Sequence, residues 1–70
     1  MLLSSVPVGE TSQVKAIWGG EKIKEMLEDV GITLESEISV VFKAWDDALV
    51  VGVDGRRVIM DQELAGKITV

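Results

Sequence analysis

The dipeptide Asp54-Gly55 separates two short apolar runs and thereby limits the folds open to this chain. The runs are Leu49 to Val53 and Arg56 to Met60. Asp-Gly between such runs favours a two-residue hairpin turn, because both positions tolerate positive φ angles. The turn also fixes the register of the two strands. The predicted pairs are Val53 with Arg56, Gly52 with Arg57, Val51 with Val58, Val50 with Ile59 and Leu49 with Met60.

This register gives the predicted hairpin two different faces. The face expected in the core consists of Leu49, Val51, Val53, Val58 and Met60. On the other face, Val50 and Ile59 break the alternation that a single buried face would require, as does Val41 in an earlier strand. If the helix of the chain covers these three residues they belong to the core, and if it does not they form a small apolar patch that marks an interaction surface. The sequence favours neither alternative.

The first half of the chain predicts a strand, a helix and a second strand. Residues 12–18 alternate as a half-buried strand, with Val14, Ala16 and Trp18 on one face and Gln13 and Lys15 on the other. After Gly19-Gly20, four apolar residues recur at helical spacing, and Gly31 fits the residue just past the helix end. The four helix residues expected in the core are Ile23, Met26, Leu27 and Val30. The next strand places Ile38, Val40 and Phe42 on one face.

The remaining signals are two turns and a last strand. Residues 6–10 predict a turn built on Pro7 and Gly9. Asp61 is positioned to cap one helical turn, Gln62 to Ala65, before a final strand over residues 67–70. The chain therefore has about five short strands, one helix and a helical turn. This mainly β pattern predicts a small, partly open SH3-like barrel with an inserted helix, and an OB-like barrel is the alternative.

Composition narrows the class of protein further. The 70 residues suit one domain over 1–70, and 47% hydrophobic residues exceed what disordered chains contain. The absence of cysteine excludes a disulfide scaffold or a zinc finger. A net charge of -5 argues against nucleic acid as a partner. No apolar stretch is long enough to insert in a membrane and no signal peptide is evident, so the expected location is cytoplasmic.

The sequence offers little for catalysis or for metal binding. Histidine, cysteine and tyrosine are absent, and the serines and threonines lie in no nucleophile motif. We therefore expect that the protein is not an enzyme and that it has no catalytic residue and no cofactor. Gly19-Gly20 lacks the Lys-Ser/Thr that completes a nucleotide-binding loop. Two adjacent acidic pairs, Glu28-Asp29 and Asp46-Asp47, could hold a divalent cation weakly. Solvated surface acids are the better interpretation of both pairs, so we expect no metal site.

Binding to another protein is the role that the residues leave open. Interfaces are enriched in large aromatic residues that are partly exposed. Trp18 lies beside the Gly19-Gly20 break, and Trp45 lies in a polar loop, although either tryptophan could instead cap an end of the core. The candidate partner-binding residues are Trp18, Trp45, Val41, Val50 and Ile59.

Taken in order, several segments resemble the FeoA family of small cytoplasmic proteins. These segments are Gly9, Gly19-Gly20, Ile23 to Ile32, Ile38 to Val40, Asp54 to Met60 and Ala65 to Val70. The resemblance implies an SH3-like fold and a non-enzymatic accessory role in bacterial ferrous iron uptake. It also implies docking on the FeoB membrane GTPase transporter and modulation of it.

The resemblance leaves two questions open. The competing hypothesis is a metal-sensing domain that binds Fe(II) or another divalent ion through carboxylates. Weak self-association is also expected, because the edge of residues 68–70 could pair with a second copy.

Overall fold

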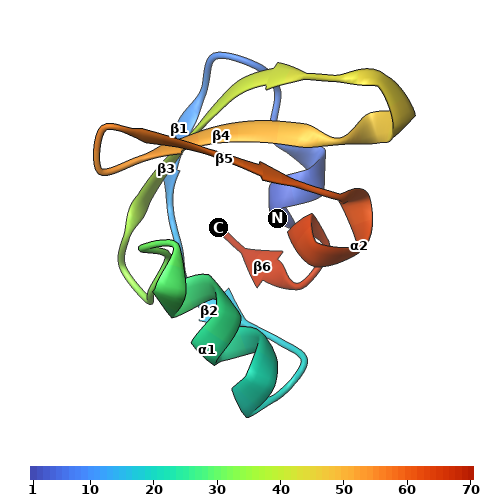
Figure 1. The fold of residues 1–70 in the computed structure, drawn as a ribbon. Coiled ribbons are helices and arrows are strands. Elements are labelled where there is room, and N and C mark those ends of the chain that lie inside the picture. The colour runs from blue at the N-terminus through green and yellow to red at the C-terminus, as the bar shows by residue number, and fades with distance from the viewer.

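The computed structural model describes residues 1–70, and its elements follow one another closely (Figure 1). The chain forms six strands, two α-helices and two 3₁₀ turns. The elements are η1 (Leu3–Ser5), β1 (Thr11–Gln13), β2 (Ala16–Ile17), α1 (Glu21–Asp29), β3 (Glu37–Lys43), η2 (Trp45–Asp47), β4 (Leu49–Val53), β5 (Arg56–Met60), α2 (Gln62–Ala65) and β6 (Ile68–Thr69).

The strands form two antiparallel sheets. The larger sheet has four strands in the order β1-β3-β4-β5, and the smaller pairs β2 with β6. In Figure 1 the β4–β5 hairpin crosses the upper half of the molecule, and α1 and the smaller sheet lie below it. All five predicted hairpin pairs are confirmed, from Val53 with Arg56 to Leu49 with Met60. Asp54 and Gly55 both have positive φ, as a two-residue turn requires.

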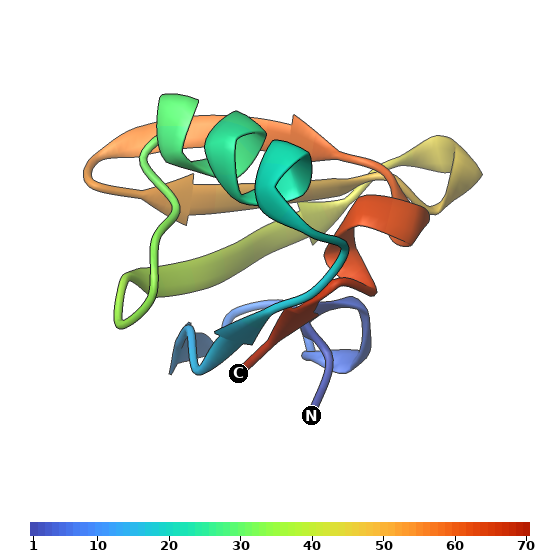
Figure 2. The same ribbon diagram turned by 90° about the horizontal axis from the view of Figure 1, so that it is seen from below.

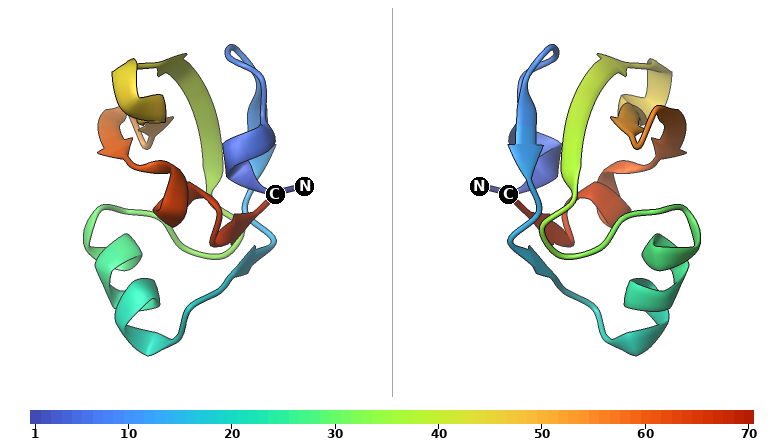
Figure 3. Two further views of the ribbon diagram at one scale, coloured as in Figure 1. Left: turned by 90° about the vertical axis from the view of Figure 1, so that its right-hand side faces the viewer. Right: turned by 90° about the vertical axis from the view of Figure 1, so that its left-hand side faces the viewer.

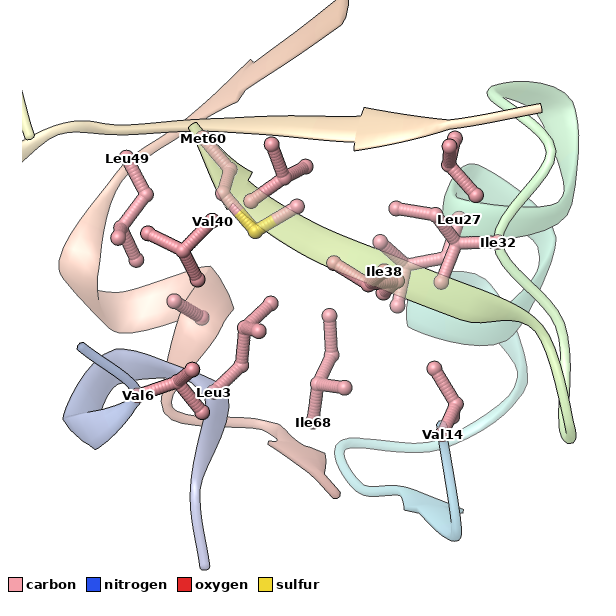
Figure 4. Packing of buried hydrophobic residues seen from close by; sticks show 13 residues of the cluster. Leu3, Val6, Val14, Leu27, Ile32, Ile38, Val40, Leu49, Met60 and Ile68 are labelled. Atoms are coloured by element: carbon pink, nitrogen blue, oxygen red, sulfur yellow. The ribbon is translucent and has the colours of Figure 1, made fainter. Parts of the chain in front are cut away.

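The end of α1 is set by Gly31, as predicted. Gly31 has a φ of 90°, and its N–H donates to the carbonyl of Glu28 at 2.9 Å, while the N–H of Ile32 donates to the carbonyl of Leu27 at 2.8 Å. These two bonds form a Schellman motif, which satisfies carbonyls that the helix end would leave free. The motif also brings Leu27 and Ile32 together in the core, where both are buried (Figure 4).

The core lies between the two sheets and is closed by α1 and the N-terminal segment. In Figure 4 side chains from β3, β4, β5, α1 and β6 point toward one another. The predicted hairpin face is confirmed, since Leu49, Val51, Val53 and Met60 are buried and Val58 packs against them. The predicted helix face is confirmed at Leu27, Ile23 and Val30. Met26 is an exception, because it is 46% exposed.

The predicted first strand is wrong in one respect, because the chain bends at Val14 and Lys15. Before the bend β1 pairs with β3, and after it β2 pairs with β6. At the bend the N–H of Val14 donates to Ser36 O at 2.9 Å and the N–H of Lys15 donates to Thr69 O at 2.7 Å. A strand that passes from one sheet to another must bend, and the bend interrupts its alternation. Ile17 therefore packs against the core in place of Trp18.

The β3 strand also departs from simple alternation. Val40 pairs with Val51, but the next pair is Phe42 with Val50, so Val41 is an extra residue in a β-bulge. The bulge shifts Phe42 to the face of the sheet opposite Val40. Phe42, predicted to face the core with Val40, is accordingly 50% exposed.

The edge expected to pair with a second copy is already occupied. On one side β6 pairs with β2. On its other side Thr69 forms a bridge with Leu2, and the N–H of Val70 donates to Met1 O at 2.8 Å. Figure 3 shows the two termini side by side. The prediction that residues 68–70 offer a free edge is therefore wrong. The predicted helix cap is confirmed, because the side chain of Asp61 accepts the Leu64 N–H of α2 at 2.8 Å.

Candidate functional site

The side of the four-stranded sheet that faces away from the core is called here the outer face. An apolar row crosses it at one register position, where Phe42, Val50 and Ile59 lie on neighbouring strands. Ile59 is 72% exposed, whereas Val50 is only 7% exposed. Val50 is nevertheless outside the buried core cluster. Val50 lies between Phe42 and Ile59 in this row. Neither predicted alternative describes the whole face, because Ile59 is exposed while Val50 is buried.

The five candidate residues do not contribute equally to a surface. Ile59 presents most of its side chain to solvent, whereas Val50 offers almost no contact area and supports its two neighbours. Val41, the extra residue of the bulge, is half-buried. The exposed part of the row is thus Phe42 and Ile59. Phe42 was missed because its bulge cannot be recognised from alternation alone.

Trp45 lies in the η2 turn (Trp45–Asp47), which joins β3 to β4 at one end of the four-stranded sheet (Figure 2). Its side chain is 86% exposed, so it does not cap the core. Two features fix the turn: the N–H of Ala44 donates to Ala48 O at 2.8 Å, and Nε2 of Gln62 donates to Asp47 O at 2.9 Å. Both bonds anchor the backbone of the turn, and the large apolar surface of the indole is uncovered.

The turn that carries Trp45 also has unusual backbone geometry. Asp46 and Asp47 have φ angles of 60° and 58°. Non-glycine residues rarely adopt this region, although aspartate tolerates it better than most. Such positions persist where the surrounding structure holds them, and they cluster at functional sites. The acidic pair Asp46-Asp47, interpreted from the sequence as solvated surface acids, thus belongs to the same turn as the exposed Trp45.

Trp18 lies at a different place on the molecule. It follows β2, whereas η2 lies at the opposite end of the structure (Figures 1 and 3). Trp18 is 60% exposed, and its indole Nε1–H donates to Oγ1 of Thr69 at 2.8 Å. The backbone N–H of Trp18 donates to Lys67 O at 2.7 Å. The two tryptophans therefore do not form one surface, and Trp18 is the more firmly fixed of the two.

A polar groove lies next to the apolar row on the outer face. Thr11, Ser39, Gly52 and Arg57 share one register position across all four strands. Gly52 has no side chain, and Nη1 of Arg57 lies 3.3 Å from the point that a Cβ on Gly52 would occupy. Oγ1 of Thr11 lies 2.7 Å from Oγ of Ser39. The resulting groove has a volume of about 520 Å³ and also includes Glu37 and Val41.

A second, smaller pocket lies on the other side of the molecule. It has a volume of about 240 Å³ and is lined by Ile17, Lys24, Glu28, Thr33 and Leu34. Neither hollow was predicted from the sequence. The predicted pairing of Gly52 with Arg57 was the one signal that pointed to the larger one.

Two further observations bear on the candidate functions. No three acidic side chains come together in a group that could hold a metal ion. The pairs Glu28-Asp29 and Asp46-Asp47 stay separate along the chain. No helix of the structure combines the length and the apolar character that crossing a membrane requires.

Comparison with solved structures places the fold. An iron uptake regulatory protein (FeoA) shares 27% identity, with a TM-score of 0.85 over 94% of this chain and 86% of its own. FeoA of Stenotrophomonas maltophilia, complexed with zinc and described as a prokaryotic SH3 domain protein, shares 23% identity, with a TM-score of 0.83 over 100% of this chain and 88% of its own. The predicted SH3-like fold is therefore confirmed.

The same fold occurs inside a larger protein. A manganese-dependent transcriptional repressor shares 21% identity, with a TM-score of 0.87 over 97% of this chain but 39% of its own. Among curated protein sequences, none matches this chain. The family model of the FeoA domain, in contrast, matches residues 1–70. This match over the whole chain shows that the protein belongs to the FeoA family.

Proposed function

We propose that this chain, as one domain over residues 1–70, is a non-enzymatic, cytoplasmic accessory protein of bacterial ferrous iron uptake. Its partner is a FeoB-type membrane GTPase transporter, which it binds and modulates. The family supports the role in iron uptake. One related structure is called an iron uptake regulatory protein, and another a candidate ferrous iron transport activating factor.

The observation that carries the docking part of the proposal is the exposure of three large apolar side chains, Trp45, Phe42 and Ile59. Interface anchors are typically aromatic or large apolar side chains in exposed positions. Trp45 is 86% exposed on a turn fixed by two hydrogen bonds, so little ordering of its backbone remains to oppose binding. Val41 and Val50 support this surface, and Trp18 provides a separate, second contact point.

The test is co-purification of this chain with full-length FeoB from the same source, with and without guanine nucleotide and Fe(II). Trp45→Ala and Ile59→Thr should each weaken binding by about tenfold or more, as expected for anchor residues. Val8→Ala is the matched control, because Val8 is also exposed but lies in the turn before β1. Trp18→Ala shows whether the other end of the molecule contributes.

The outcome also decides between the two functional classes. Binding that is lost in Trp45→Ala and kept in Val8→Ala supports docking through the outer face. If no nucleotide state binds, and the isolated chain takes up Fe(II) selectively and stoichiometrically, the docking proposal fails and metal sensing replaces it. Circular dichroism of each variant checks that the fold is retained.

A further inference from the structure

The four-stranded sheet has a free edge at β5, which is the last strand in its order. The strand is short and begins with two arginines, Arg56 and Arg57. A free edge exposes unpaired N–H and C=O groups that can pair with another strand. Native proteins leave such an edge open where charges or a specific partner control it. The edge of β5 is therefore a place where a further strand can add to the sheet.

The register of the hairpin shows which backbone groups of β5 point outward. In a two-residue hairpin the residues that flank the turn, Val53 and Arg56, form a hydrogen-bonded pair. Hydrogen-bonded and non-bonded pairs then alternate along an antiparallel ladder. Arg56, Val58 and Met60 consequently direct their backbone groups toward β4, and Arg57 and Ile59 direct theirs to the free edge. By the same alternation the N–H of Asp61, the next residue, also faces outward.

We propose that β5 pairs antiparallel with β5 of a second copy of this chain, with Ile59 opposite Ile59. The register of this pairing follows from the side chains. The residues whose backbone groups point to the free edge are Arg57, Ile59 and Asp61. Pairing them with the same residues of a second copy allows three symmetric registers, in which Arg57 lies opposite Arg57, Ile59 or Asp61. The first sets like charges opposite each other, and the second sets a charge opposite an apolar residue. The third alone joins Arg57 to Asp61 and Ile59 to Ile59, both favourable cross-strand pairs.

The outer face supports the third register beyond the two strands themselves. The row Phe42, Val50 and Ile59 would continue into the same row of the second copy, which covers the 72% exposed side chain of Ile59. The polar row of Thr11, Ser39, Gly52 and Arg57 would continue to Asp61 of the second copy. Both outer faces lie on the same side in this arrangement, so one eight-stranded sheet results.

Asp61 can take part while it caps α2. Its Oδ1 accepts the Leu64 N–H at 2.8 Å, which leaves the second carboxylate oxygen for Arg57 of the other copy. Its carbonyl accepts the Ala65 N–H at 3.0 Å, so its backbone N–H is the group that it offers to the new ladder.

The contact is small, because it involves one short strand from each copy. Stable complexes bury about 1,200 Å² or more, and smaller contacts are weak and reversible. We therefore expect a dissociation constant on the order of 0.1 to 1 mM. This inference goes beyond the proposed function and does not depend on it, because it needs no transporter.

Two variants at one position test the backbone part of the proposal. Ile59→Pro removes the outward N–H but no hydrogen bond to β4, so the fold should survive, as edge prolines do. Ile59→Val is the matched control, since it keeps both the N–H and an apolar side chain. Sedimentation equilibrium should show the wild-type chain and Ile59→Val dimerising with constants within about threefold of each other, and Ile59→Pro should remain monomeric.

The charged pair is tested separately. Arg57→Gln should raise the dissociation constant by about twofold to thirtyfold, because the symmetric contact contains the pair twice. Asp61→Asn should have a similar effect, and it preserves the helix cap because asparagine is as good a capping residue as aspartate.

A direct measurement does not depend on any variant. Val58 of one copy would lie opposite Met60 of the other in a non-bonded pair, where the strands approach most closely. In a mixed sample of labelled and unlabelled chains, an intermolecular nuclear Overhauser effect between Hα of Val58 and Hα of Met60 is expected. A chain that stays monomeric at about 1 mM, or a dimer without this contact, overturns the proposal.

Discussion

The two faces of the β4–β5 hairpin are made of similar residues but have different environments. Leu49, Val51 and Met60 point inward and are buried, while Ile59 points outward and is 72% exposed. Because successive side chains of a strand point to opposite sides, neighbours such as Val50 and Val51 belong to different parts of the molecule. Val51 is part of the core cluster. Val50 is not part of it, although Val50 is only 7% exposed.

Apolar character alone therefore does not distinguish residues that stabilise the fold from residues available for binding. The inner face is covered by α1, the smaller sheet and the N-terminal segment, whereas no element of the chain covers the outer face (Figure 1). Changes on the inner face should therefore act on stability, and changes on the outer face should act mainly on interactions.

The largest expected effect comes from the inner face. Leu49→Ala should lower the free energy of unfolding by about 2 to 5 kcal/mol, because Leu49 is fully buried and a cavity would remain. Small domains are marginally stable, so this is a large share of the total. Urea denaturation followed by circular dichroism measures it. A loss below about 1 kcal/mol would show that the core collapses onto the gap and that the inner face is less tightly packed than described.

A smaller but more specific comparison uses two adjacent valines. Val51→Thr should lower the free energy of unfolding by about 1 to 3 kcal/mol, because its hydroxyl would be buried among apolar side chains. Val50→Thr should cost less than Val51→Thr, because Val50 lies outside the core cluster and its neighbours in the row, Phe42 and Ile59, are exposed. Thermal unfolding of the two variants in parallel measures the difference. Equal losses would contradict the separation of the two faces.

Much of the fold could be predicted because it depends on local signals. Asp54-Gly55 specified the hairpin and its register, Gly31 specified the end of α1, and Asp61 specified the cap of α2. Each of these residues satisfies a local requirement of backbone geometry or hydrogen bonding that does not depend on the rest of the chain.

The errors share a different physical cause, because each depends on contacts between distant segments. The chain bends at Val14 because it passes from β3 to β6, and neither partner is visible in the local sequence. The bulge at Val41 depends on pairing with β4 and turned Phe42 outward. The occupied edge of β6 depends on the N-terminal residues at the other end of the chain.

The candidate site was predictable to a similar extent. Alternation placed Ile59 on the face opposite the core residues of the hairpin, whereas the sequence left open whether Trp45 is exposed or caps the core. Sequence could not show that Val50 is buried while its partners Phe42 and Ile59 are exposed, because burial depends on how three strands come together. The polar groove was missed because it requires all four strands in register. Whether these residues bind a partner stays a prediction.

The smallest expected effect concerns Gly52, the outer-face residue that leaves room for Arg57. Gly52→Ala should raise the free energy of unfolding by about 0.5 kcal/mol, because alanine loses less conformational freedom than glycine on folding. The new Cβ would lie 3.3 Å from Nη1 of Arg57, so the guanidinium must shift by a few tenths of an ångström. The shift is inexpensive because the arginine side chain is flexible, and urea denaturation measures the net effect.

The same substitution in an Arg57→Gln background isolates the contribution of the guanidinium through a double-mutant cycle. If the Arg57 side chain can move at little cost, Gly52→Ala changes the free energy of unfolding by nearly the same amount in both backgrounds. The groove is then an adaptable part of the outer face. A destabilisation by Gly52→Ala that disappears with Arg57→Gln would mean that the guanidinium is held firmly against the strand. In that case the outer face would contain a packed element of its own, and the contrast with the inner face would be weaker than the exposed row suggests.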